Sequence, residues 1–78
     1  MSQLLLPKVH PTAQEAVLVS QELAAGQSFV PGDVLHEVET DKVVSQVEAQ
    51  VAGRLVSWLA EEGATVKVGA PVATYEDV

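Results

Sequence analysis

Short apolar runs, most of them rich in valine, alternate with turn signals along the whole chain. Glycine and proline recur between the runs, for example in Val30–Asp33 and Val68–Pro71. Apolar runs of this length that are bounded by glycine and proline are typical of strands. The pattern therefore predicts six strands, at Leu4–Leu6, Ala16–Leu23, Val34–Glu39, Val43–Ala49, Leu55–Leu59 and Val72–Tyr75.

One segment, Gln14–Ala25, also has the composition of a helix, because alanine and glutamate are common in it. The run Val17–Val19 in its middle favours a strand instead, since β-branched side chains lose rotamer freedom in a helix. We therefore expect strand in this segment and keep a helix as the alternative.

The two halves of the chain repeat each other. Gly26 and Gly63 lie 37 positions apart, and so do Gly32 and Gly69. Each half reads as a strand, a turn at glycine, a second glycine turn and another strand, and such self-similarity indicates architecture. Two copies are too few for a solenoid. Because each copy consists of strands and turns, we predict an all-β fold. The expected form is a flattened β-barrel or sandwich of two small antiparallel sheets with pseudo-twofold symmetry.

Composition limits the function classes. The chain has 78 residues, 47% of them hydrophobic, which predicts one domain over residues 1–78 with an apolar core. Its net charge of −7 disfavours nucleic acid as a partner, because phosphates would repel it. The absence of cysteine excludes disulfides, thiolate metal sites and a cysteine nucleophile. His10 and His36 have no neighbours with metal-ligand spacing, so no metal site is expected.

The chain shows no sign of membrane insertion or export. The leucine run at Leu4–Leu6 is too short for the core of a secretory signal, and no basic stretch precedes it. No apolar run approaches the length of a membrane span. We expect a soluble cytoplasmic domain that is monomeric when isolated.

The segment Glu37–Val44 predicts a β-hairpin, because apolar strand residues flank a polar centre. Asp41 and Lys42 both tolerate the negative φ of a type I turn, which would place Lys42 at the tip. Nearby carboxylates favour the charged ammonium, so Lys42 is better suited to being presented to another protein than to acting as a nucleophile. On composition alone, an ordinary solvated lysine is the simpler interpretation.

The sequence Glu39–Val44 resembles the lipoyl-lysine motif of the lipoyl domains of 2-oxo acid dehydrogenase complexes, most closely the succinyltransferase component of the 2-oxoglutarate complex. The resemblance covers nearly the whole chain. The other similar segments are Leu4–Pro7, Gly26–Leu35, Gly53–Val56 and Glu62–Gly69. The family often has a tryptophan near Gln21, whereas the single tryptophan here is Trp58.

The resemblance implies a carrier rather than a catalyst. Lipoic acid would be joined by an amide to Lys42 and would act as a swinging arm. Its partners would be a lipoate-attaching enzyme, a thiamin-dependent 2-oxo acid decarboxylase, an acyltransferase core and the flavin enzyme dihydrolipoamide dehydrogenase. The residues read by these partners would be Glu39, Thr40, Asp41 and Val43, with the loop Val9–Glu15 as a further candidate. The location would be the bacterial cytosol or the mitochondrial matrix.

Three alternatives belong to other classes. A biotin carrier shares the fold, but its lysine usually lies between two methionines, and this chain has only Met1. An unmodified lipoyl-like interaction module generally lacks the Asp-Lys pair that Asp41 and Lys42 form here. A small enzyme is the weakest alternative, because no nucleophile–base set, carboxylate pocket or metal cluster is visible.

Overall fold

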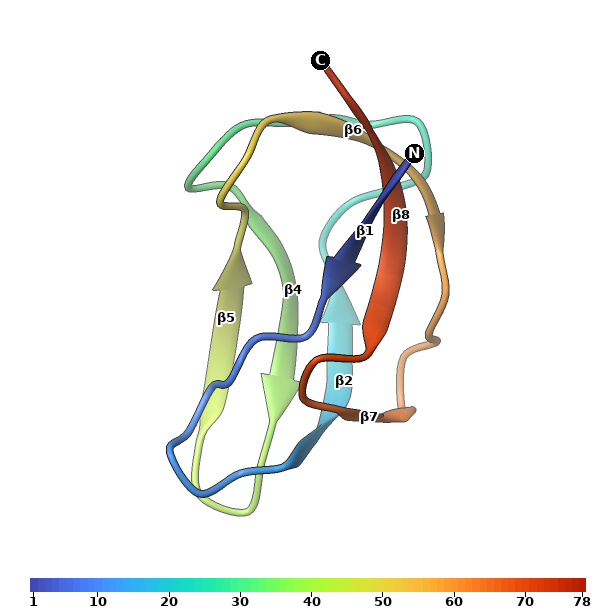
Figure 1. Cartoon of the computed structure of the whole chain (residues 1–78). Coiled ribbons are helices and arrows are strands. Elements are labelled where there is room, and N and C mark those ends of the chain that lie inside the picture. Colours follow the sequence, from blue (N-terminus) through green and yellow to red (C-terminus); the bar gives the residue numbers. More distant parts are fainter.

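The computed structural model describes all 78 residues and consists of eight strands joined by turns and loops (Figure 1). The strands are β1 (Ser2–Leu5), β2 (Glu15–Gln21), β3 (Ser28–Phe29), β4 (Val34–Glu39), β5 (Val44–Glu48), β6 (Gly53–Trp58), β7 (Thr65–Lys67) and β8 (Pro71–Asp77). No helix in the structure has the length and apolar character needed to cross a membrane.

The strands form two four-stranded antiparallel sheets. One sheet has the order β1-β8-β6-β3 and the other β5-β4-β2-β7, so each sheet takes strands from both halves of the chain. The all-β fold of two small antiparallel sheets is confirmed.

The six strands expected from the apolar runs are all present, with ends that differ by at most two residues. The helix alternative for Gln14–Ala25 is wrong, because this segment contains β2. The strands β3 and β7 were not expected. They have two and three residues and bury one side chain each, Phe29 and Val66, so they are too short to show a period along the sequence.

Backbone hydrogen bonds confirm the 37-residue repeat. The N–H of Leu18 donates to the carbonyl oxygen of Ala64 at 2.9 Å, and the N–H of Leu55 donates to that of Gln27 at 2.9 Å. Leu55 lies 37 positions after Leu18, and Ala64 lies 37 positions after Gln27, so the two bonds are equivalent in the repeat. Strand register also shifts at equivalent places, between Leu18 and Ser20 in β2 and between Leu55 and Ser57 in β6.

The repeated glycines are required by their backbone conformation. Gly26 and Gly63 have φ of 90° and 91°, a region that other residues rarely adopt. The second pair, Gly32 and Gly69, has φ of 96° and 88°. The glycines at which the sequence predicts turns thus all have positive φ, and they close the same turns in both halves.

The core lies between the two sheets. Its largest fully buried side chains include Phe29, Leu18 and Leu55, and the ring of Phe29 meets that of Tyr75 edge to face at 5.7 Å. Trp58 is half-buried, and it packs against the core from its margin. The one buried polar residue is His36.

The two ends of the molecule differ. Both chain termini lie at one end, and the β4–β5 connection lies at the other (Figure 1). The segment that links β1 to β2 also reaches the second end, where it runs beside the β4–β5 connection (Figure 1). The β4–β5 connection, which contains the candidate lysine, therefore lies at the end of the molecule opposite to the termini (Figure 1).

Candidate functional site

Strands β4 and β5 form the hairpin expected from the sequence. They pair antiparallel from Val34 opposite Glu48 to Glu39 opposite Val44. The connection contains four residues, Thr40–Val43, so Lys42 stands at the tip of a regular two-stranded support. This placement agrees with the prediction.

Thr40 organises the tip through its hydroxyl group. The backbone N–H groups of Lys42 and Val43 both donate to Oγ1 of Thr40 at 3.1 Å. The N–H of Thr40 donates to the carbonyl oxygen of Val43 at 2.8 Å. No residue other than glycine has positive φ, so the tip is not a primed turn and the expectation of negative φ at Asp41 and Lys42 is confirmed. The side chain of Thr40 thus takes up two amide groups that the turn leaves free.

The amine of Lys42 is available to other molecules. Asp41, Lys42 and Val43 are exposed, and so is the following Val44. The structure has one salt bridge, which joins Arg54 to Glu76 at another place on the surface. No carboxylate therefore pairs with the Lys42 ammonium, although acidic residues flank it in the sequence.

The loop Val9–Glu15 lies next to the tip, as its candidate role in recognition requires. A shallow cleft of about 530 Å³ separates the two. It is lined by Thr12–Val17 on one side and by Glu39, Thr40 and Asp41 on the other, and Thr65 also borders it. Val43 does not border this cleft. The fold therefore brings together three of the four expected tip residues with the loop and leaves Val43 on another side of the tip.

The two histidines lie in different environments. His10 belongs to the loop, where its Nδ1 lies 3.0 Å from the hydroxyl oxygen of Thr12. His36 is buried between the sheets, and burial lowers its pKa to about 4. No group of three or more His, Cys, Asp or Glu side chains could hold a metal ion.

Sequence reasoning missed the burial of His36 in a cleft. Strict alternation along β4 would place only one of Leu35 and His36 in the core. The register between β4 and β5 shifts between Val34 and His36, and the shift turns both Leu35 and His36 inward. Only a comparison with the second half of the chain carries a signal, because Ala73, at the equivalent position, is an apolar residue.

The chain is similar to a family of known proteins. A family profile described as Biotin-requiring enzyme (biotin/lipoyl) matches residues 2–75. The chain belongs to the biotin/lipoyl family. The matched residues include the β4–β5 hairpin and both pairs of repeated glycines. The match confirms the resemblance inferred from Glu39–Val44.

Curated relatives of this biotin/lipoyl domain come from two kinds of dehydrogenase complex. The chain is 42% identical over 74 residues to the pyruvate dehydrogenase complex protein X component, mitochondrial, of Saccharomyces cerevisiae. It is 34% identical over 73 residues to the dihydrolipoyllysine-residue succinyltransferase component of the 2-oxoglutarate dehydrogenase complex of Staphylococcus saprophyticus. Each match covers 94% of this chain but only 18% and 17% of the respective relative.

A solved structure has the same fold. The lipoyl domain of the 2-oxoglutarate dehydrogenase complex from Azotobacter vinelandii superposes with a TM-score of 0.76 at 21% sequence identity. The match covers 99% of this chain and 98% of the other. A single-chain, multi-domain long-chain acyl-CoA carboxylase also matches, with a TM-score of 0.71 and 25% identity over 91% of this chain and 8% of that one. The biotin/lipoyl barrel-sandwich is therefore the fold of this domain.

Proposed function

We propose that this domain is a lipoyl carrier, with lipoate joined by an amide bond to Nζ of Lys42. One observation carries the proposal: Lys42 is exposed and without an ion pair at the tip of a hairpin whose backbone N–H groups donate to the hydroxyl of Thr40. A covalent group on this amine needs no binding pocket, because the bond itself fixes its point of attachment. The residues present therefore fit such a group.

The residues of the tip have separate tasks in this function. Strands β4 and β5 keep the attachment point at a fixed place, and Thr40 holds the backbone amides of Lys42 and Val43. Conversion of the Lys42 ammonium to an amide removes its positive charge and leaves the tip acidic. When bound, lipoate supplies the dithiolane that carries acyl groups and reducing equivalents.

Recognition by partners is assigned to the surface around the lysine. Glu39 and Asp41 present carboxylates beside the loop Val9–Glu15, and Val43 presents an apolar side chain on another side. The partners would be the attaching enzyme, a thiamin-dependent decarboxylase, an acyltransferase and dihydrolipoamide dehydrogenase. Because named relatives belong to mitochondrial and bacterial complexes, the place of action would be the mitochondrial matrix or the bacterial cytosol.

A biotin carrier is the second candidate, and the structural likeness to an acyl-CoA carboxylase favours it. The residues beside the lysine, Asp41 and Val43, favour lipoate, since the lysine of biotin carriers usually lies between two methionines.

Intact-mass spectrometry tests the proposal. The chain is produced with lipoate and a lipoate-attaching enzyme, and separately with biotin and a biotin-attaching enzyme. We expect the lipoyl mass on the wild type and on the matched control Lys67→Arg, but not on Lys42→Arg. A lipoyl mass on Lys42→Arg, or no lipoyl mass on the wild type, contradicts the proposal. A biotinyl mass alone supports the second candidate.

A further inference from the structure

The seam between the two sheets opens into a cleft at one side of the molecule. Strands β1 and β5 are edge strands of different sheets, and the space between them has a volume of about 610 Å³. One wall consists of residues in and after β1, namely Gln3–Leu5 and Pro7–Val9, and the other consists of residues in and after β5, namely Ser45–Glu48, Gln50 and Val51. Cavities of this size are typical of sites for small molecules.

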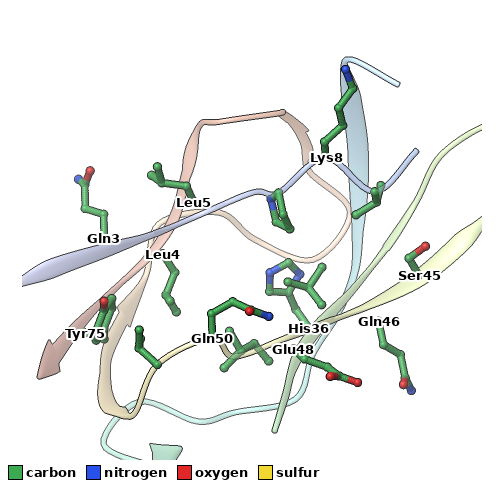
Figure 2. A pocket seen from close by; sticks show the side chains of 15 residues that line it. Gln3, Leu4, Leu5, Lys8, His36, Ser45, Gln46, Glu48, Gln50 and Tyr75 are labelled. Atoms are coloured by element: carbon green, nitrogen blue, oxygen red, sulfur yellow. The ribbon is translucent and has the colours of Figure 1, made fainter. Parts of the chain in front are cut away.

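His36 lies in this cleft with an unpaired ring nitrogen. Its side chain is 1% exposed, and Nδ1 is the one buried side-chain nitrogen or oxygen in the chain that has no hydrogen-bond partner. Buried polar atoms almost always have a hydrogen-bond partner, either in the protein or in an ordered water molecule. The position of the ring within the cleft is visible in Figure 2. Nδ1 therefore needs a partner that the protein does not supply.

The fold does not require a polar side chain at this position. Ala73, which lies 37 positions after His36, is fully buried at the equivalent place in the second half. The neighbours of the pair also correspond, with Leu35 equivalent to Val72, and both of these are buried. The imidazole is thus a departure from the repeat at the point where the cleft forms.

The lining favours a neutral, mainly apolar molecule. Figure 2 shows Leu4, Gln50 and His36 directed into the cleft, while Lys8 and Glu48 are directed away from it. Desolvation lowers the pKa of His36 to about 4, so its ring is uncharged at neutral pH. The net charge of −7 further disfavours an anion.

We propose that the cleft between β1 and β5 binds a neutral small molecule with an apolar body and one hydroxyl or amide group, which forms a hydrogen bond with Nδ1 of His36. The apolar body would contact Leu4, Leu35 and Val47, and the amide of Gln50 would lie beside the polar group. This site is separate from Lys42 and does not depend on its modification.

Four probes of the same shape test the class of ligand. Toluene, benzyl alcohol, benzoate and benzylammonium are titrated into the ¹⁵N-labelled chain, and amide chemical shifts are recorded. We expect benzyl alcohol to shift the amides of the cleft residues in β1, β4 and β5. Its affinity should exceed that of toluene by about three- to tenfold, the effect of one hydrogen bond. The two charged probes should bind more weakly than benzyl alcohol.

Two variants connect the binding to named residues. His36→Phe keeps a ring of similar shape without nitrogen, and it should bring the ratio of the benzyl alcohol and toluene affinities to about one. Gln50→Trp places a large side chain in the cleft from an exposed position, and it should weaken all four probes. Because Gln50 lies outside the core, this second variant is informative even if His36→Phe does not fold.

Three outcomes would overturn the proposal. In the first, no probe shifts the cleft amides. In the second, the preference for benzyl alcohol persists in His36→Phe. In the third, the capped peptide acetyl-Val-Ala-Val-amide binds the same amides more tightly than benzyl alcohol, which would identify the cleft as a groove for an added strand.

Discussion

Gln21 and Trp58, which lie 37 positions apart, make the same hydrogen bond in the two halves of the molecule. Nε2 of Gln21 donates to the carbonyl oxygen of Ala60 at 2.7 Å, and Nε1 of Trp58 donates to that of Leu23 at 2.9 Å. Leu23 and Ala60 are equivalent as well. Each bond links the end of a strand in one half to the backbone that follows a strand in the other half. An amide and an indole thus perform one structural task, because each offers an N–H at the required place.

Loss of either donor should destabilise the fold to a similar degree. Gln21→Leu and Trp58→Phe each leave a carbonyl group without its partner, so each should lower the free energy of unfolding by about 1–2 kcal/mol. Urea denaturation followed by circular dichroism measures the effect. Ser57→Ala, which removes an exposed hydroxyl contact with Thr74, is the control and should change stability by less than about 0.5 kcal/mol. A cost at only one of the two positions would show that the bonds are not equivalent.

The hydroxyl of Thr40 should matter more for modification of Lys42 than for stability. Thr40→Val removes the acceptor for two backbone N–H groups but keeps the shape of the side chain. We expect a loss of about 1 kcal/mol in stability, the usual cost of a lost capping group. Attachment of lipoate to Lys42 should become several-fold slower, whereas Thr40→Ser should retain the wild-type rate. Time-resolved intact mass measures the rates, and equal rates in all three proteins would contradict a positioning role for Thr40.

Burial of His36 should make the fold sensitive to acid. Its pKa falls from 6.5 to about 4 in the folded state, so the unfolded chain binds a proton first as the pH decreases. Stability should therefore be independent of this group above pH 6.5 and should decrease between about pH 6.5 and 4. The expected loss at pH 4.5 is about 2–3 kcal/mol.

The variant His36→Phe isolates this contribution. The other titratable groups that border the cleft are Lys8, Glu48 and Tyr75. They and the remaining carboxylates are present in both the wild type and the variant, so their effects cancel in the comparison. The difference in the free energy of unfolding between wild type and variant, measured at pH 7.5 and 4.5, should change by about 2–3 kcal/mol in favour of the variant at the lower pH. An unchanged difference would mean that the ring is protonated in the folded state at the same pH as in the unfolded chain.

Two glycine substitutions should be costly for different reasons. A Cβ at Gly53 would lie 2.7 Å from Cδ2 of Tyr75 and 2.8 Å from the carbonyl oxygen of Glu76. Because one of these atoms belongs to the backbone, Gly53→Ala should cost about 3 kcal/mol. A Cβ at Gly63 would meet no atom within 4 Å, so Gly63→Ala should cost only about 1–2 kcal/mol, from the positive φ.

The contrast between these sites can be checked with one further variant. Asparagine tolerates positive φ better than alanine, so Gly63→Asn should recover part of the stability lost in Gly63→Ala. Gly53→Asn should recover none, since its Cβ meets the same atoms. Thermal unfolding of the four variants gives the comparison, and recovery at Gly53 would contradict the packing explanation.

The sequence predicts most of the architecture because the strands that carry the fold are long enough to show a pattern. The apolar runs locate β4 at its observed bounds, and the spacing of Gly26 and Gly63 predicts the internal repeat. The short strands β3 and β7 escape prediction because each has a single inward side chain. Such short segments become strands because they pair with a partner strand, and only the tertiary structure determines that pairing.

The hairpin tip is predictable for a local reason, and the cleft is not. Glu39–Val44 specifies a turn with a central lysine through neighbouring residues alone. The cleft at His36 arises from a register shift in β4 and from the separation of two edge strands that are distant in sequence. The hydroxyl of Thr40 is an intermediate case, because threonine is a common turn residue but its two bonds depend on the actual backbone geometry.

Lys42 and the chain termini lie at opposite ends of the molecule, and this arrangement affects how far a group on Lys42 can reach. The molecule is 34 Å long, with both termini at one end and the tip at the other (Figure 1). A segment joined to either terminus would leave from the end opposite the amine (Figure 1). The folded domain would then act as a rigid spacer between that segment and the group on Lys42. A group on Lys42 would sweep a space set by the length of the protein as well as by the length of its own side chain.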